Sequence, residues 1–97
     1  MRFEWDEKKN RINQAKHGVS FEVAKLVFND PYVTSQLDRE TGHVEERWLT
    51  LGSAMGLAVL LVIHTVREEN DGEEIIRIIS ARKATARERA VYLRHHT

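Results

Sequence analysis

The spacing of hydrophobic residues changes at Pro31, and this change divides the chain into a helical part and a strand-forming part. In "FEVAKLVFN", residues 21–29, apolar side chains recur every three or four positions, which places them on one face of a helix. Ser20 can cap the start of that helix. Pro31 ends it, because proline disfavours helical geometry in the residue before it. We therefore predict a helix that packs through its apolar face.

The segment before this helix predicts a short strand followed by a polar helix. "FEW", residues 3–5, suits a strand, and Asp6 can cap a helix over "DEKKNRINQAKHG". In that helix only Ile12 and Ala15 lie on an apolar side. Gly18 favours the left-handed backbone conformation that ends a helix. The first part of the chain is thus predicted to be strand–helix–helix.

Beyond Pro31 the apolar residues follow strand patterns. "YVTSQLD" and "VEERWLTLG" predict two strands, and "LAVLLVIHTVR", residues 57–67, is apolar enough for a central strand buried on both faces. "EIIRIISARK", residues 74–83, predicts a further strand. Asp71-Gly72 lies between the last two strands and is a strong hairpin signal, so we expect these strands to be antiparallel neighbours.

A last helix over residues 86–95 completes the predicted order of elements. Thr85 and Glu88 form a T-x-x-E capping box at its start. The order β-α-α-β-β-β-β-α segregates the helices from an antiparallel meander, which predicts an α+β fold. The length of 97 residues predicts one domain, residues 1–97.

Composition and the lengths of the apolar runs indicate the cellular compartment in which the protein acts. The chain has no cysteine, which excludes disulfides and thiol chemistry. The N-terminus has no apolar signal-peptide core. The longest apolar run, "GLAVLLVI", is far shorter than the roughly 20 residues that a membrane helix needs. We therefore expect a cytoplasmic protein with no membrane partner.

The net charge of zero conceals an uneven distribution. Residues 1–20 carry five Lys/Arg and three Asp/Glu, residues 21–74 carry four and eleven, and residues 75–97 carry six and one, which gives +2, −7 and +5. Clustered cations displace counterions from phosphates, so the basic end suits RNA. A partner of opposite charge, or an ordinary solvated charge pattern, explains the same distribution.

His64 is the histidine that best suits catalysis, because it ends the most apolar predicted strand and Arg67 follows three positions later. Symmetry about the predicted turn brings His64 near Arg77. The same symmetry sets Arg82 about 10 Å or more away at roughly 3.4 Å per residue. Strand alternation puts His64 and Arg67 on opposite faces of the sheet unless the strand bulges between them. The spacing thus permits a His/Arg site but does not require one.

A histidine with arginines is chemically sufficient to cut RNA without a metal ion, because RNA supplies its own nucleophile, the 2′-hydroxyl. Imidazole can move a proton at neutral pH, and guanidinium can hold two phosphate oxygens and stabilise developing charge. The alternative is that His64 is a core histidine and that the arginines pair with the acidic segment. None of the histidines has a metal-ligand spacing, and no phosphate-binding glycine loop is present, so we predict neither a metal site nor a cofactor.

Four segments together resemble the BrnT toxins of bacterial type II toxin–antitoxin systems. They are "FEWDEKKNRINQAKHGVSFEVAKLVFNDP" (3–31), "EERWLTLG" (45–52), "HTVRE" (64–68) and "RIISARKATARERAVY" (77–92), of which K-H-G-V-S-F and R-I-I-S-A-R are the most specific parts. The resemblance implies a compact RelE-like fold and a ribonuclease that arrests growth by cutting RNA. It also implies that a BrnA antitoxin neutralises the toxin and that operator DNA is contacted only through their complex.

Carried over to matching positions, the resemblance implies a catalytic set and a weaker set of RNA-binding residues. The catalytic set is His64, Arg67 and Arg82, and the RNA-binding set is Lys16, His17, Arg77 and Lys83. A second interpretation belongs to another class of function. In it the protein is a binding module that captures its antitoxin and represses its operon, with weak or absent catalysis.

Overall fold

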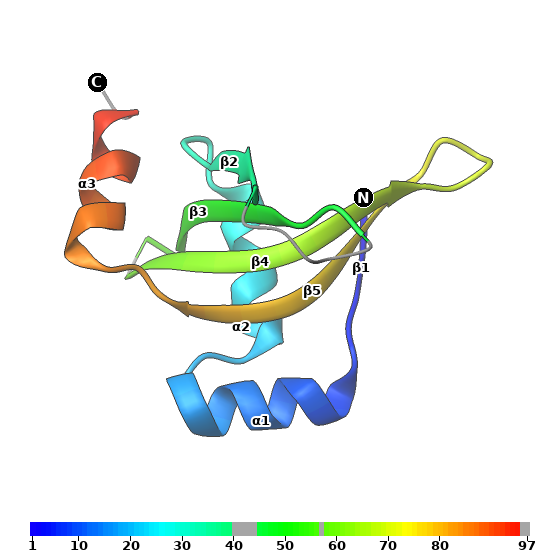
Figure 1. The fold of residues 1–97 in the computed structure, drawn as a ribbon, viewed down its shortest axis with the longest axis horizontal. Helices are drawn as coiled ribbons and strands as arrows, with labels where there is room; N and C mark the ends of the chain where they lie inside the picture. The colour runs from blue at the N-terminus through cyan, green and yellow to red at the C-terminus, as the bar shows by residue number, and fades with distance from the viewer. Residues whose placement is uncertain (40–44, 57, 96–97) are drawn as a thin grey trace.

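A computed structural model describes residues 1–39, 45–56 and 58–95, and in these residues the chain forms a five-stranded sheet with helices on both faces (Figure 1). The elements are β1 (Arg2–Glu4), α1 (Glu7–His17), α2 (Phe21–Ala24), the 3₁₀ helix η1 (Lys25–Asn29), β2 (Thr34–Leu37), β3 (Trp48–Ala54), β4 (Ala58–Glu68), β5 (Glu74–Lys83) and α3 (Ala86–Arg94). The predicted α+β fold and element order are confirmed. Two predicted strands begin at residues 44 and 57, which lie outside the described residues.

The sheet has the strand order β1-β5-β4-β3-β2. All neighbours are antiparallel except β1, which runs parallel to β5 at the edge. The predicted β4–β5 hairpin is confirmed, with His64 opposite Ile78 and Leu61 opposite Arg82. A bulge between Ile63 and His64 shifts the register at that point. Arg82 is therefore three residue pairs along the ladder from His64.

One face of the sheet is covered by α1, α2 and η1 (Figure 1). Phe21, Ala24 and Val27 are fully buried against β4 and β5, which confirms the predicted apolar face. The helix tightens into a 3₁₀ helix at Lys25. Gly52 of β3 lies directly under this turn, because a Cβ there would be 2.5 Å from the Val27 side chain.

Helix α1 attaches to the sheet through asparagines, which the hydrophobic pattern did not predict. The predicted polar helix is confirmed, but its two apolar residues, Ile12 and Ala15, are exposed and do not attach it to the sheet. Asn13 is buried, and its amide nitrogen donates to the carbonyl oxygens of Val19 and Ala81 at 2.9 and 2.8 Å. Its oxygen accepts from the backbone N–H of Ala81 at 3.3 Å. Directed hydrogen bonds therefore replace apolar packing.

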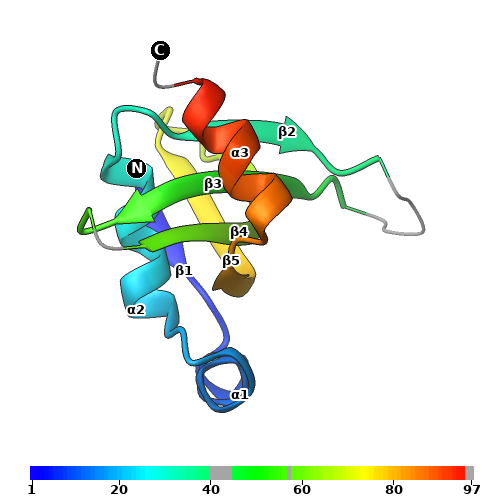
Figure 2. The same cartoon turned by 90° about the vertical axis from the view of Figure 1, so that its left-hand side faces the viewer.

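The opposite face, which we call the open face, carries α3 at one end only. Figure 2 shows α3 lying across β3 and β4, and there Tyr92 packs with Leu51 and Leu61. The predicted capping box of Thr85 and Glu88 starts this helix. Among the described residues, no helix is both long and apolar enough to cross a membrane. The remainder of the open face is left uncovered by α3.

Candidate functional site

His64 lies inside the protein, on the face that α1, α2 and η1 cover. Its side chain is 2% exposed, and the ring of Phe28 stands edge-on to it with 5.0 Å between ring centroids. The imidazole Nε2 is 2.6 Å from the Thr50 hydroxyl, which is in turn 2.7 Å from the Ser35 hydroxyl. Nδ1 is 3.3 Å from the Thr65 carbonyl oxygen. Both ring nitrogens thus have partners within the chain.

Burial lowers the pKa of His64, because the interior disfavours the charged imidazolium; the hydrogen bond to the Thr65 carbonyl acts in the opposite direction. In the neutral ring, Nδ1–H donates to that carbonyl and Nε2 accepts from the Thr50 hydroxyl. Strand alternation puts Arg67 on the open face, so His64 and Arg67 lie on opposite faces, as the sequence predicted for a strand with no bulge between them. The sheet therefore separates the His64 ring from a phosphate on the open face.

Arg67 and Arg77 lie together at the end of the open face farthest from α3. Arg67 donates to both carboxylate oxygens of Glu4, with Nη2 3.1 Å from Oε2. Arg77 Nη1 is 3.5 Å from the same carboxylate. The hydrogen bond from Arg67 is the main reason that the pKa of Glu4 is lowered. One carboxylate therefore compensates two of the predicted cations.

Arg82 lies at the other end of the open face, beside the start of α3. Its Nη1 and Nη2 are 2.8 and 2.9 Å from the two carboxylate oxygens of Glu88. This hydrogen bonding is the main cause that lowers the pKa of Glu88 to about 2. The sequence identified Glu88 as a capping residue, but its pairing with Arg82 depends on how the chain turns between β5 and α3.

The Arg82–Glu88 pair borders a pocket of about 590 Å³, which we call the open-face pocket. It is lined by Gln36, Leu37, Asp38, Arg39, Leu49, Leu61, Ile63, Arg82 and Glu88. Its carboxylates and guanidiniums come from β5, from α3 and from the chain after β2. The structure thus brings Arg82 together with Asp38 and Arg39, which the sequence did not single out, because no local pattern links segments so far apart.

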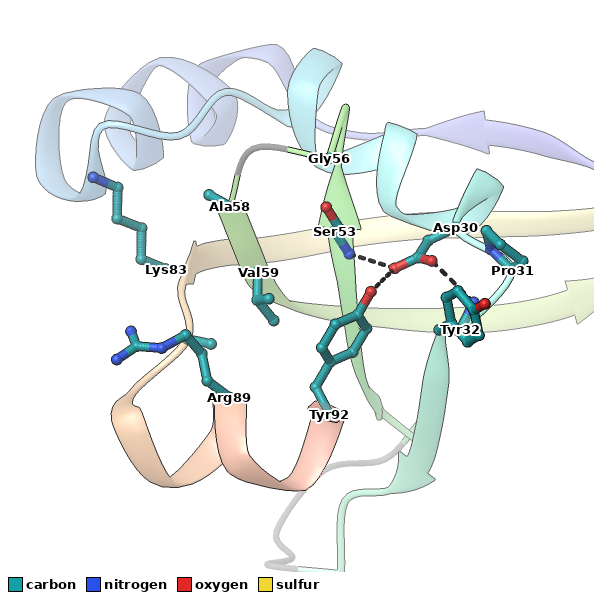
Figure 3. A pocket seen from close by; sticks show the side chains of 11 residues that line it. Asp30, Pro31, Tyr32, Ser53, Gly56, Ala58, Val59, Lys83, Arg89 and Tyr92 are labelled. Carbon is teal, nitrogen blue, oxygen red and sulfur yellow. Dashed lines mark hydrogen bonds between the residues drawn. The ribbon is translucent and has the colours of Figure 1, made fainter. Parts of the chain in front are cut away.

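Lys83 borders a second pocket of about 590 Å³ at the end of the sheet, the sheet-end pocket (Figure 3). Tyr92 of α3 and Asp30 also line it, and the Tyr92 hydroxyl donates to the Asp30 carboxylate.

Lys16 and His17 lie in the last turn of α1 and line neither pocket. The seven predicted residues are therefore spread over several parts of the surface and the core.

Metal ligands do not gather in the part of the chain that the structure describes. In residues 1–39, 45–56 and 58–95, no three side chains of histidine, cysteine, aspartate or glutamate are placed to hold an ion. Metal-independent cleavage of RNA stays a prediction, which cleavage assays in the presence of EDTA can test.

The comparisons with known proteins agree with this fold. A family model described as "Ribonuclease toxin, BrnT, of type II toxin-antitoxin system" matches residues 5–88. The crystal structure of the Brucella abortus ribonuclease toxin BrnT is similar, with 25% sequence identity and a TM-score of 0.59. The match covers 88% of this chain and 97% of the Brucella chain. A comparison with curated proteins gave no match. Because the family model spans most of its length, the chain belongs to the BrnT family of ribonuclease toxins of type II toxin–antitoxin systems.

Proposed function

We propose that this protein is an endoribonuclease toxin that cuts RNA in the cytoplasm without a metal ion, arrests growth and is neutralised by a BrnA-type antitoxin. The observation that carries the proposal is the Arg82–Glu88 pair at the open-face pocket, in a chain of the BrnT family. The pair joins a phosphate ligand to a carboxylate that can accept a proton, and RNA supplies the nucleophile.

Arg82 is the proposed ligand of the reacting phosphate. Its guanidinium already holds Glu88 through two parallel hydrogen bonds, which is the geometry that a phosphate accepts equally well. An RNA phosphate that enters the pocket competes with Glu88 for the guanidinium. The guanidinium then lies where negative charge develops on the phosphorus oxygens and stabilises that charge.

Glu88 becomes a stronger base when Arg82 turns to the phosphate, because the main cause of its low pKa is then lost. We propose that its carboxylate takes the proton of the RNA 2′-hydroxyl. The 2′-oxygen bonds to phosphorus, the bond from phosphorus to the 5′-oxygen breaks, and that oxygen takes a proton from water. The products are a 2′,3′-cyclic phosphate and a 5′-hydroxyl end.

The other predicted residues receive different roles in this proposal. Arg67 and Arg77 bind RNA phosphates at the end of the open face farthest from α3. There the RNA phosphates replace the Glu4 carboxylate as partners of the two guanidiniums. Lys16 and His17 stay predicted RNA-binding residues on another part of the surface. His64 acts as a positioning residue, because its ring connects β4 to Thr50 of β3 and to Phe28 of η1.

The first prediction concerns Arg82. Arg82→Lys keeps one positive charge but loses the two-point geometry, so we expect kcat/KM for RNA cleavage to fall at least about tenfold, which corresponds to about 1.4 kcal/mol. The assay uses purified protein, single-stranded RNA and excess EDTA, and the ends of the products are identified by mass.

Arg11→Lys is the matched control, since Arg11 is an exposed residue of α1 that lines neither pocket. Glu88→Gln is expected to lower kcat, and thermal melts establish that each variant is folded. Equal activity of wild type and Arg82→Lys contradicts the role of Arg82. Loss of wild-type cleavage in EDTA contradicts metal independence, and 3′-phosphate or 5′-phosphate ends as primary products contradict the 2′-hydroxyl mechanism.

A second candidate function is the non-catalytic binding module. It is favoured by the ion pairs themselves, because Arg67, Arg77 and Arg82 all have carboxylate partners within the chain. In this function the arginines hold the fold, and the protein acts by binding its antitoxin and repressing the operon. Absence of RNA cleavage by folded wild-type protein favours this second function.

A further inference from the structure

The sheet-end pocket has two chemically different sides (Figure 3). Lys83 and Arg89 stand on one side, where β5 ends and α3 begins. Asp30, Tyr32 and Tyr92 stand on the other side, around the end of β3. A pocket of about 590 Å³ falls within the range of about 300–1,000 Å³ that is usual for ligand sites.

The cationic side is formed by the exposed residues Lys83 and Arg89. Among the described residues, the side chains of Lys83 and Arg89 form no ion pair, in contrast to Arg67, Arg77 and Arg82. Both cations are therefore available to an anion that enters the pocket. An ammonium and a guanidinium on the same rim suit the oxygens of one phosphate.

The opposite side has a compensated carboxylate and an aromatic ring. Asp30 accepts from the backbone N–H of Ser53 at 2.7 Å and of Tyr32 at 2.9 Å, and from the Tyr92 hydroxyl. These donors offset its charge, so it repels an incoming anion less. The half-exposed ring of Tyr32 lies on this side, and Pro31 adds apolar surface. A flat heterocycle can stack there.

We propose that the sheet-end pocket binds one nucleotide of the RNA strand, with its phosphate between Lys83 and Arg89 and its base against Tyr32. The inference rests on the proposed function and adds a second subsite to it. A nucleotide matches the pocket because it joins an anionic end to an aromatic end. The two pockets are bordered by neighbouring residues at two places, Arg82 and Lys83 at the end of β5 and Glu88 and Arg89 on α3, so an RNA strand that crosses this end of the sheet reaches both pockets.

Such a subsite acts on binding and leaves the chemical step unchanged. Contacts to a flanking nucleotide are the same in the substrate and in the transition state, so they lower KM without changing kcat. A substrate too short to reach the subsite gains nothing from it. Dependence on substrate length therefore distinguishes the flanking site from the reacting site at Arg82.

The test compares the double variant Lys83→Gln/Arg89→Gln with the control Lys8→Gln/Arg11→Gln, which removes the same charges from α1. Cleavage of a ten-nucleotide single-stranded RNA and of a dinucleotide is measured for each. We expect the pocket variant to raise KM for the longer RNA at least about fivefold at unchanged kcat, and to leave the dinucleotide unaffected. Tyr32→Leu should raise KM in the same way.

The cleavage assays distinguish failure of the RNA subsite from failure of the proposed ribonuclease function. If wild type cleaves RNA and the pocket variant behaves like the control, the subsite is wrong and the proposed function stands. If wild type cleaves nothing, the proposed function fails. The affinity for a 2′-O-methyl ten-nucleotide RNA then decides the subsite, since the pocket variant must weaken it at least about fivefold relative to the control. If adenosine monophosphate raises the melting temperature of wild type alone while the variants bind RNA equally, the pocket takes a free nucleotide and the RNA subsite is overturned.

Discussion

At the scale of single residues, His64 is held in the core by Phe28 of η1 and Thr50 of β3. Its position opposite Ile78, and its separation from Arg67 by the sheet, followed from the hairpin signal and from strand alternation. Its burial did not follow, because Phe28 and Thr50 reach it from other segments. A histidine at the end of an apolar strand has the same local pattern whether its ring faces solvent or the core.

The second prediction concerns His64 and pH. The folded protein keeps the ring neutral below its ordinary pKa of 6.5, whereas the unfolded chain binds a proton there. The stabilisation is thus complete above that pH and is lost as the pH falls. We expect the free energy of unfolding to decrease by about 1 kcal/mol between about pH 7.5 and 5.5, and His64→Gln to lack this decrease.

Urea unfolding at a series of pH values measures this effect, and His17→Gln serves as the control that keeps it. The RNA assay runs in parallel, because His64→Gln retains most of the activity if the ring only positions its neighbours. If folded His64→Gln protein cleaves RNA at least about tenfold more slowly than wild type, His64 is a catalytic residue and not only a positioning residue.

At the scale of elements, the attachment of α1 depends on side chains that a hydrophobic pattern disregards. Asn10 and Asn13 are three positions apart and share the buried side of the helix. The Asn10 oxygen accepts from the backbone N–H of Phe21 at 2.8 Å, where α2 begins. Periodicity of apolar residues could predict the apolar face of α2. It could not predict which side of α1 packs against the sheet, because polar contacts leave no apolar signal.

The third prediction tests this attachment. Asn13→Ala removes the partner of the carbonyl oxygens of Val19 and Ala81, which stay buried, so we expect a loss of about 2–4 kcal/mol in the free energy of unfolding. Gln14→Ala, on the exposed side of α1, should change it by less than about 0.5 kcal/mol. Urea unfolding of both variants gives the comparison, and equal losses would show that the asparagine bonds are not what holds α1.

At the scale of the whole molecule, the chain combines a correctly predicted order of elements with one pairing that no local pattern indicates. The meander from β2 to β5 follows from alternation and from a single turn signal. The parallel contact of β1 with β5 joins Phe3 to Ile76, far apart in sequence. The open-face pocket likewise assembles residues from β2 to α3, which is why the sequence found Arg82 but missed its surroundings.

The fourth prediction concerns the antitoxin. The protein has a net charge of −7 over residues 21–74 and +5 over residues 75–97, so both signs of charge are available to an antitoxin. Arg82 lies on the open face, so an antitoxin that covers this face excludes RNA from Arg82. We expect RNA cleavage to fall in proportion to added BrnA-type antitoxin and to stop at a fixed molar ratio. Operator DNA should be bound by the mixture, whereas the toxin alone should not bind it.

Gel-shift and cleavage assays on the same samples measure both effects. Undiminished cleavage at saturating antitoxin contradicts neutralisation through the open face. Binding of operator DNA without cleavage at any ratio supports the binding-module function in place of the ribonuclease.

The pairing of β1 with β5 also bears on how the protein is made. Synthesis proceeds from the N-terminus, so β1 leaves the ribosome well before the segment that it pairs with. Until β5 emerges, Phe3 has no strand partner and Glu4 has no Arg77 beside it. The sheet of a nascent chain therefore stays incomplete until β5 (Glu74–Lys83) has been translated. A chain that is released early lacks both this closing contact and the arginines of the basic end.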